Sequence, residues 1–191
     1  LQAPAGAISL GPIDTQGILN GGNIGITAAN EVALSPISAA SPIGEGGKIE
    51  ISGTQITVSG NLTTSNQPII FNAPVLLAAD IAITSAGAGS IAFADSINGT
   101  YQLTLDVDTG MVTLGTGIGN LTPLQSVTIS GNAASESPEF AIATLGNIQL
   151  QNLTAPQGLS LSSQNGGIYA SLLSTVNRTN AGNVTLSGKT I

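Results

Sequence analysis

Residues 46–53, Gly-Gly-Lys-Ile-Glu-Ile-Ser-Gly, repeat the pattern of residues 21–28, Gly-Gly-Asn-Ile-Gly-Ile-Thr-Ala, 25 residues further along the chain. The repeat extends beyond the glycines to apolar residues. The alignment matches Ile24 with Ile49 and Ile26 with Ile51. When one residue is then deleted, it also matches Val32 with Ile56, Leu34 with Val58, and Ile37 approximately with Leu62. Two successive units therefore carry the same apolar positions.

Weaker copies of this unit continue along the chain. They open at Gly89, Gly110, Gly146, Gly167 and Gly182, with one longer unit between Leu114 and Gly146. A repeat of this size, about 20 to 25 residues, is typical of stacked supersecondary units. Within a unit, apolar residues alternate with polar or small ones, as in Val184-Thr185-Leu186, and this is the pattern of half-buried β-strands.

The composition also favours strands. Only 7% of the 191 residues are charged, whereas an ordinary globular domain carries roughly 25%. The polar positions are occupied mostly by Ser, Thr, Asn and Gln, which tolerate strands and turns, instead of by the Lys, Glu and Arg that favour helices. We therefore expect helix to be absent as a major element.

Short strands separated by Gly and Asn, in units of this length, predict a right-handed parallel β-helix (β-solenoid) with coils of roughly 20–25 residues. The equivalent strands of successive coils would pair, with a rise of about 4.8 Å per coil. Residues 1–191 are expected to form one domain. An interior aliphatic stack is predicted from Ile24, Ile49, Ile91, Ile148, Ile168 and Val184.

Corners and loops follow from the residues between the strands. Asn23, Asn61, Asn147 and Asn183 are predicted at corners, where Asn tolerates left-handed backbone and could form ladders along the axis. Residues 132–139, which hold two acids and a proline, are predicted to leave the coil as a loop. The chain ends within a unit, at residues 183–191, without a capping element. We therefore expect a segment of a longer shaft, or a subunit on which another copy stacks.

Several kinds of chemistry are excluded by composition. Cys and His are absent, which removes disulfides, thiolate or imidazole metal sites, and catalysis by Ser-His-Asp or Cys-His groups. With three cationic side chains and a net charge of −7, neither nucleic acid nor a polybasic membrane anchor fits. The apolar stretch 68–94 is interrupted by polar residues. Because of these interruptions we expect it to form strands and not a membrane span. No cofactor is expected.

Asp106 and Asp108 are the closest pair of acids that could carry chemistry. Their spacing of two residues places both on one side of a strand, which is compatible with a catalytic pair or with weak metal ligands for Ca²⁺. The interpretation that we prefer is two solvated carboxylates on the outer face. A calcium loop would need further oxygen ligands at regular spacing, and these are missing.

Six Asn-x-Thr sequons are present. They could accept glycans on an extracellular surface, or they could arise from the frequent use of Asn at corners and Thr in strands, which is the interpretation we favour. The six asparagines are Asn61, Asn98, Asn120, Asn152, Asn177 and Asn183.

Aromatic and threonine residues give weaker signals. Tyr101, Tyr169, Phe71, Phe93 and Phe140 are few and dispersed, so we expect them to fill corners or the core and not to form a platform for sugars. Ice binding would need regular ranks of Thr, and the spacing of the threonines between residues 54 and 64 is not maintained from unit to unit.

Two stretches carry a resemblance to a known family. Residues 103–115 (LTLDVDTGMVTLG) and 118–129 (IGNLTPLQSVTI) resemble the repeats of filamentous-haemagglutinin-like bacterial exoproteins. Residues 182–188 and 21–30 are similar to other repeats of this class. The resemblance implies a right-handed β-helical shaft in a large adhesin that is secreted or held at the cell surface of a bacterium.

The leading functional hypothesis is therefore structural. We expect a shaft segment or filament subunit, extracellular and without enzymatic activity, that assembles end to end with copies or adjoining segments of the same protein and has cell-surface glycans as further partners. The alternatives are a β-helical polysaccharide-degrading enzyme, in which Asp106 and Asp108 would act, and a carbohydrate- or ice-binding module.

Overall fold

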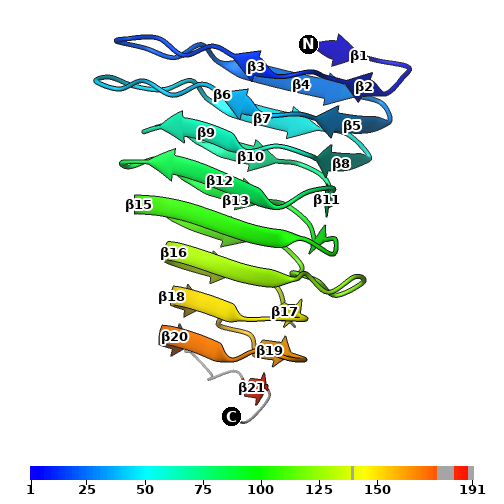
Figure 1. Ribbon diagram of the computed structural model, residues 1–191, viewed down its shortest axis with the longest axis vertical. Coiled ribbons are helices and arrows are strands. Elements are labelled where there is room, and N and C mark those ends of the chain that lie inside the picture. Colours follow the sequence, from blue (N-terminus) through cyan, green and yellow to red (C-terminus); the bar gives the residue numbers. More distant parts are fainter. Residues whose placement is uncertain (139, 176–182, 189–191) are drawn as a thin grey trace.

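A computed structural model describes residues 1–138, 140–175 and 183–188. The described chain forms a right-handed parallel β-helix of about eight turns (Figure 1). All its strand pairings are parallel, and its described residues include no helix. The all-β fold class predicted from the repeat is thus confirmed. The described residues accordingly include no helix with the length and apolar character of a membrane span.

The strands form three faces along the axis, and most coils contribute a strand to each face. Face 1 contains β1 (Gln2–Ala3), β4 (Ile24–Ala28), β7 (Ile49–Ser52), β10 (Ile69–Phe71), β13 (Ile91–Phe93), and the second halves of β15 (Gln102–Leu114), β16 (Ser126–Ser135), β18 (Ile148–Thr154) and β20 (Ile168–Ser174). Face 2 contains β2 (Ile8–Ser9), β5 (Glu31–Leu34), β8 (Gln55–Val58), β11 (Val75–Leu77), β14 (Ile97–Asn98), β17 (Phe140–Thr144), β19 (Leu159–Ser163) and β21 (Val184–Ser187). Face 3 contains β3 (Ile13–Asp14), β6 (Ile37–Ser38), β9 (Leu62–Ser65), β12 (Ile81–Ala86), and the first halves of β15, β16, β18 and β20.

The register of the strands reproduces the alignment of the first two repeat units. All five predicted pairs are neighbours in the sheets, namely Ile24 with Ile49, Ile26 with Ile51, Val32 with Ile56, Leu34 with Val58, and Ile37 with Leu62. These side chains point inward and are almost fully buried. Apolar repetition in the sequence therefore corresponds directly to stacking in the core.

Of the six residues predicted to form one interior stack, only the first three do so. Ile24, Ile49 and Ile91 do belong to one stack on face 1, together with Ile69 and Val112. In contrast, Ile148 and Ile168 stack on face 3, and Val184 pairs with Leu159 on face 2. The reason is that all three faces use the same alternation of apolar and polar residues, so the local motif does not specify the face.

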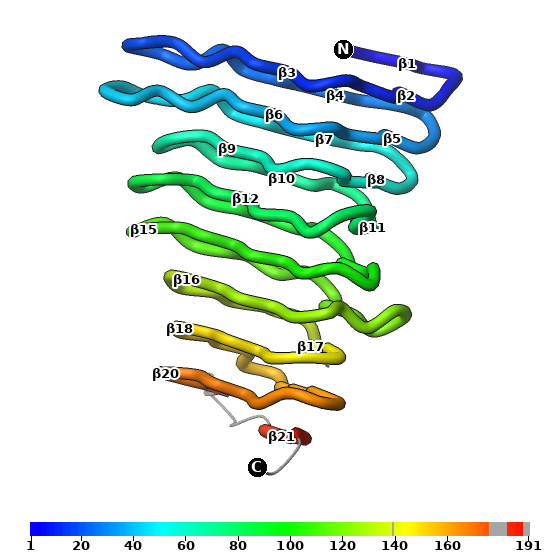
Figure 2. The backbone as a smooth tube through the Cα atoms, in the orientation of Figure 1, coloured from blue at the N-terminus to red at the C-terminus, as the bar shows by residue number. Residues whose placement is uncertain are grey.

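The corner between faces 3 and 1 changes along the axis. It is a long loop in the first two coils, at residues 15–23 and 39–48, and shortens to 66–68 and 87–90 in the next two. From β15 onward a single strand runs through the corner, with register shifts between Asp106 and Met111 and between Ile129 and Asn132. The coils consequently shorten, and the molecule tapers from its N-terminal to its C-terminal end (Figure 2).

The predicted loop at residues 132–139 is shorter than expected. Residues 132–135 form the end of β16, and among the described residues only 136–138 lie between this strand and β17. Ala133 points inward, where it is 4% exposed and stacks between Val112 and Leu153. The acids and the proline that indicated a loop all follow residue 135, whereas the small residues before them continue the strand, with Ala133 directed inward.

Asparagines at three of the four predicted corners link successive coils through their side chains. The left-handed backbone expected at these corners is not found, because among the described non-glycine residues only Asn66 has a positive φ, of 58°. The side-chain oxygens of Asn23, Asn61 and Asn147 each accept a hydrogen bond from a backbone N–H of the following coil, at Lys48 (2.8 Å), Ala82 (2.8 Å) and Gly167 (3.0 Å). Each such bond satisfies a backbone donor at a point where the chain turns. The abundance of Asn is thus explained by the fold itself.

Candidate functional site

The structure places the two predicted acids in different surroundings on β15. Asp106 lies on face 3 between Thr84 and Ser130 of the adjacent coils. Asp108 is exposed at the corner, where one carboxylate oxygen accepts a hydrogen bond of 2.9 Å from the backbone N–H of Gly87. Within the described residues, no cluster of three or more acids is suited to hold a metal ion. The geometry thus agrees best with solvated carboxylates, one of which stabilises a corner.

The sequon asparagines differ in environment. Asn98 is 8% exposed, and its side-chain oxygen accepts hydrogen bonds from the backbone N–H groups of Leu121 (3.0 Å) and Thr122 (3.2 Å). The amide of Asn152 donates to Asn132 on the preceding coil, at 2.9 Å. Asn120 and Asn183 are exposed, and Asn177 lies outside the described residues. In Asn98 and Asn152, as in Asn61, the amide therefore serves contacts between coils.

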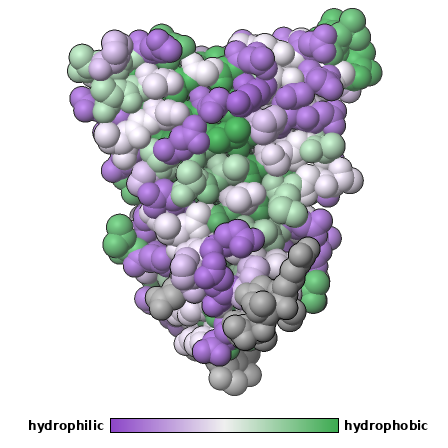
Figure 3. Space-filling model, turned by 180° about the vertical axis from the view of Figure 1, so that it is seen from behind, coloured by the Kyte–Doolittle hydropathy of each residue, from purple (hydrophilic) through white to green (hydrophobic). Residues whose placement is uncertain are grey.

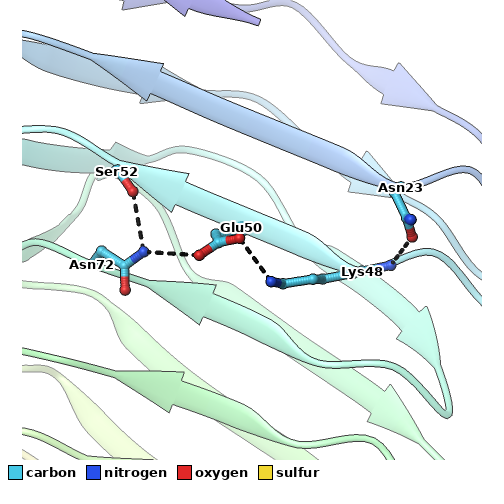
Figure 4. A network of polar contacts seen from close by, with 5 residues as sticks. All are labelled: Asn23, Lys48, Glu50, Ser52 and Asn72. Carbon is cyan, nitrogen blue, oxygen red and sulfur yellow. Dashed lines mark hydrogen bonds and ion pairs between the residues drawn. The ribbon is translucent and has the colours of Figure 1, made fainter.

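A network of polar side chains crosses face 1 in the first three coils (Figure 4). The ammonium group of Lys48 lies 2.7 Å from the carboxylate of Glu50, which also accepts a hydrogen bond of 3.3 Å from Asn72. The hydrogen bond from Lys48, followed by that from Asn72 and the charge of Lys48, lowers the pKa of Glu50 below its ordinary value of 4.5. Asn72 also donates to Ser52, at 3.1 Å. This network ties neighbouring coils together at the surface.

Apolar side chains are exposed where the two long corner loops project. Ile18, Leu19 and Ile43 are 73%, 67% and 73% exposed. Hydrophobic atoms gather at this corner of the wide end of the molecule (Figure 3). The loops are held against each other by the pairing of Asn20 with Glu45 and by a hydrogen bond of 3.1 Å from the Ser41 hydroxyl to the Ile18 carbonyl. They thus present an ordered apolar edge.

A broad hollow on the outer wall lies on face 3 of the last coils. Two adjoining depressions, of about 590 and 660 Å³, share Thr128 and Gln149 and so form one shallow trough. Its lining consists of hydroxyl, amide and apolar side chains, and none of the lining residues is charged.

Tyr169 lies in this trough and was not anticipated as a surface residue. The prediction that aromatic residues fill corners or the core holds for Phe71, Phe93 and Phe140, which are buried, and for Tyr101, which lies at the corner before β15. It fails for Tyr169, which is 52% exposed within β20. The alternation around Ile168 is the signal that could have shown this, because an inward Ile168 places Tyr169 outward.

The trough offers polar side chains and one aromatic ring along one wall, and the described residues include no group of three or more side chains that could hold a metal ion. No protein-family model, curated protein sequence or solved structure matches the chain.

Proposed function

We propose that this chain is a shaft segment or filament subunit of an extracellular bacterial surface structure or adhesin, and that such segments join end to end by continued β-strand pairing. The observed fold, a β-solenoid of stacked parallel strands, is suited to such a shaft because further coils can extend the same sheets.

The exposure of the last described coil carries the proposal. Val184 and Leu186 occupy inward positions, since they pair with Leu159 and Leu161 of the preceding coil. Leu159 and Leu161 are only 4% and 0% exposed, whereas Val184 and Leu186 are 46% and 56% exposed. Apolar side chains directed toward the axis of a solenoid gain free energy when a further coil covers them, by about 25 cal/mol per Å² of buried apolar surface. A following coil, from an adjoining segment or another copy, would supply that cover.

The backbone supports the same assembly. In the described residues β21 pairs only with β19, and β20 only with β18, so no described strand pairs with the far edge of either. Such unpaired edges are ready templates for strand addition. A head-to-tail contact of this kind does not close on itself, and therefore generates a filament.

The outer wall and the sequence resemblance support the extracellular adhesin role. The wall is rich in hydroxyl and amide groups and poor in charge, and the chain contains no cysteine, so its stability depends on the core and the backbone ladders in any redox compartment. The similarity of residues 103–129 to repeats of filamentous-haemagglutinin-like exoproteins supports a bacterial surface location.

Sedimentation velocity over a range of protein concentrations tests the assembly. We expect the wild-type chain to form species that grow with concentration, and Leu186→Lys to prevent this growth by placing a charge on the inward position at the end of the solenoid. Leu121→Lys is the matched control, because Leu121 is 84% exposed on the side wall, away from the end. A wild-type chain that remains monomeric at every concentration, or a control that dissociates as the Leu186 variant does, would contradict the proposal.

A further inference from the structure

The trough on face 3 has a regular construction. The outward side chains of three successive coils, Thr128, Gln149 and Tyr169, are direct neighbours in the parallel sheet. Adjacent coils are about 4.8 Å apart. A ligand lying along the axis would therefore meet a hydroxyl group, an amide group and an aromatic ring in succession.

Tyr169 is held against the wall by the absence of a side chain at Gly167. A Cβ atom added at Gly167 would lie only 2.7 Å from the hydroxyl oxygen of Tyr169 and 2.8 Å from two ring carbons. The ring therefore lies over Gly167, and half of the residue's surface remains exposed. A tyrosine in this position offers a rigid apolar surface with a polar tip, at little cost in conformational entropy.

Amide side chains are frequent along the trough, and two of them, Gln149 and Gln151, line the same depression as Tyr169. Gln102, Gln125, Asn147, Gln149, Gln151 and Asn165 all line the trough. Two of them are already used in the fold, since the side-chain oxygen of Asn147 accepts from Gly167 and that of Gln151 accepts from the Gly131 N–H at 2.5 Å. The side chain of Gln149 has no hydrogen-bond partner within the described residues. An amide both donates and accepts, which matches the dual character of a sugar hydroxyl.

The lack of charge in the trough favours a neutral ligand over an anionic one. None of the lining residues is charged, and Asp106 lies one coil away, paired with Ser130 at the edge of the trough. An anionic polymer would lose its hydration here without gaining an ion pair. A neutral sugar has hydroxyl groups that suit the amides, and an apolar C–H face that suits the exposed ring.

From these observations we propose that face 3 of the C-terminal coils binds a neutral hexose polymer, with Tyr169 stacking on one sugar ring and Gln149 hydrogen bonding to its hydroxyl groups. The trough is open and shallow, so a single segment binds weakly. Several segments in one shaft would bind the same polymer much more tightly through multivalency. The site lies on the side wall and not at the exposed last coil, so it does not depend on end-to-end assembly.

Affinity electrophoresis and calorimetry with a panel of polysaccharides test the proposal. The neutral arms are a soluble glucan, a mannan and a galactan, and the anionic arm is polygalacturonate. We expect at least one neutral polymer to bind, and polygalacturonate not to bind. Tyr169→Ala should weaken that binding roughly tenfold, as expected for the loss of about 1.4 kcal/mol of stacking. Tyr169→Phe, which keeps the ring, should retain most of the affinity.

Tyr101→Ala is the matched control, because Tyr101 is the other tyrosine of the chain, is also exposed, and lies outside the trough. Circular dichroism and urea unfolding of each variant separate loss of binding from loss of folding. The Leu186→Lys variant, if it blocks assembly, should still bind a short oligosaccharide. Absence of binding to all three neutral polymers, preference for the anionic polymer, or equal effects of Tyr169→Ala and Tyr101→Ala would overturn the proposal.

Discussion

At the residue scale, neighbouring side chains on one strand have opposite environments because alternate residues point to opposite sides of the wall. In β11, Leu77 points inward and is 2% exposed, whereas Leu76 points outward and is 37% exposed. The chain thus offers two residues of the same type, one peptide bond apart, that differ only in burial.

We expect Leu77→Ala to lower the free energy of unfolding by about 2–5 kcal/mol, since it removes packed methyl groups and leaves a cavity between stacked coils. Leu76→Ala should cost less than about 1 kcal/mol, because its side chain is already partly solvated. Urea unfolding followed by circular dichroism measures both. Equal losses for the two variants would show that the alternation does not decide stability at this position.

Glu50 gives a prediction for the dependence of stability on pH. Its pKa is lower in the folded chain because Lys48 and Asn72 donate hydrogen bonds to the ionised carboxylate. Its contribution to stability is therefore fully present above the unfolded pKa of about 4.5, and is lost as the pH falls through the lower folded pKa.

The urea midpoints of wild type and Glu50→Gln should consequently differ at neutral pH and converge in acid. The difference should be small and should shrink in high salt, because the pair is exposed to solvent. A difference that persists below the folded pKa, or that is unaffected by 1 M NaCl, would exclude the ion pair as its source.

Contacts between individual residues of neighbouring coils could be predicted from the sequence only for the first coils. The pairs formed by Ile24 and Ile49, and by Val32 and Ile56, followed from the alignment because two coils of similar length carry the same order of corners and strands. Ile148 was assigned to the wrong face because the coils shorten and their corners merge, so counting from a glycine no longer identifies the face. The trough could not be predicted, since it depends on residues brought together from four coils.

At the element scale, buried hydroxyl groups fix the corners. The side chain of Ser65 accepts a hydrogen bond from the Ser41 N–H (2.8 Å) and donates to the Ser41 carbonyl (3.0 Å). In this way it replaces a pair of backbone bonds where the loop 39–48 leaves the coil. Thr64, beside it, donates to the Gly47 carbonyl at 2.7 Å. The sequence pattern of Ser and Thr at strand ends therefore serves corner formation.

Ser65→Ala should lower the free energy of unfolding by about 1–3 kcal/mol, because it leaves two buried backbone groups of Ser41 unsatisfied. Hydrogen exchange at the Ser41 amide should accelerate more than exchange in β7. Ser59→Ala is the control, since Ser59 also donates to a backbone carbonyl, that of Leu34, but is exposed, so water can take its place. If both variants lose the same stability, burial of the Ser65 hydroxyl is not the cause.

At the scale of the whole molecule, coils contact mainly their nearest neighbours, so stability is approximately a sum of coil and interface contributions. Residue Ile69 pairs with Ile91 and Ile70 with Ala92, so deletion of residues 70–91 removes one complete turn and joins equivalent points of face 1. It also brings Phe93 over Ile51, which is the position of Phe71 in the intact chain.

We expect the 70–91 deletion to fold with an unchanged β-sheet spectrum and a lower free energy of unfolding. Deletion of residues 70–80, which joins Ile69 to Ile81, should fail to fold, because it brings a strand of face 3 directly after face 1. Circular dichroism and cooperative urea unfolding distinguish the two outcomes. A folded short deletion, or an unfolded full-turn deletion, would contradict the independence of the coils.

The ladder of regular strands on face 2 is interrupted once, and this is relevant to how the molecule responds to a stretching force. Between β14 and β17 the ladder consists of isolated bridges, from Ile97 to Ile118 and from Ile118 to Ile142. The hydrogen bonds between coils run along the axis, so a pull on the two ends of the molecule loads the coils in series. The coil around Ile118 has no regular strand on face 2, but backbone hydrogen bonds donated by Gly119 to Ile97 (2.7 Å) and by Ile118 to Ala141 (2.8 Å) carry the load across this gap, so that all three faces resist the pull.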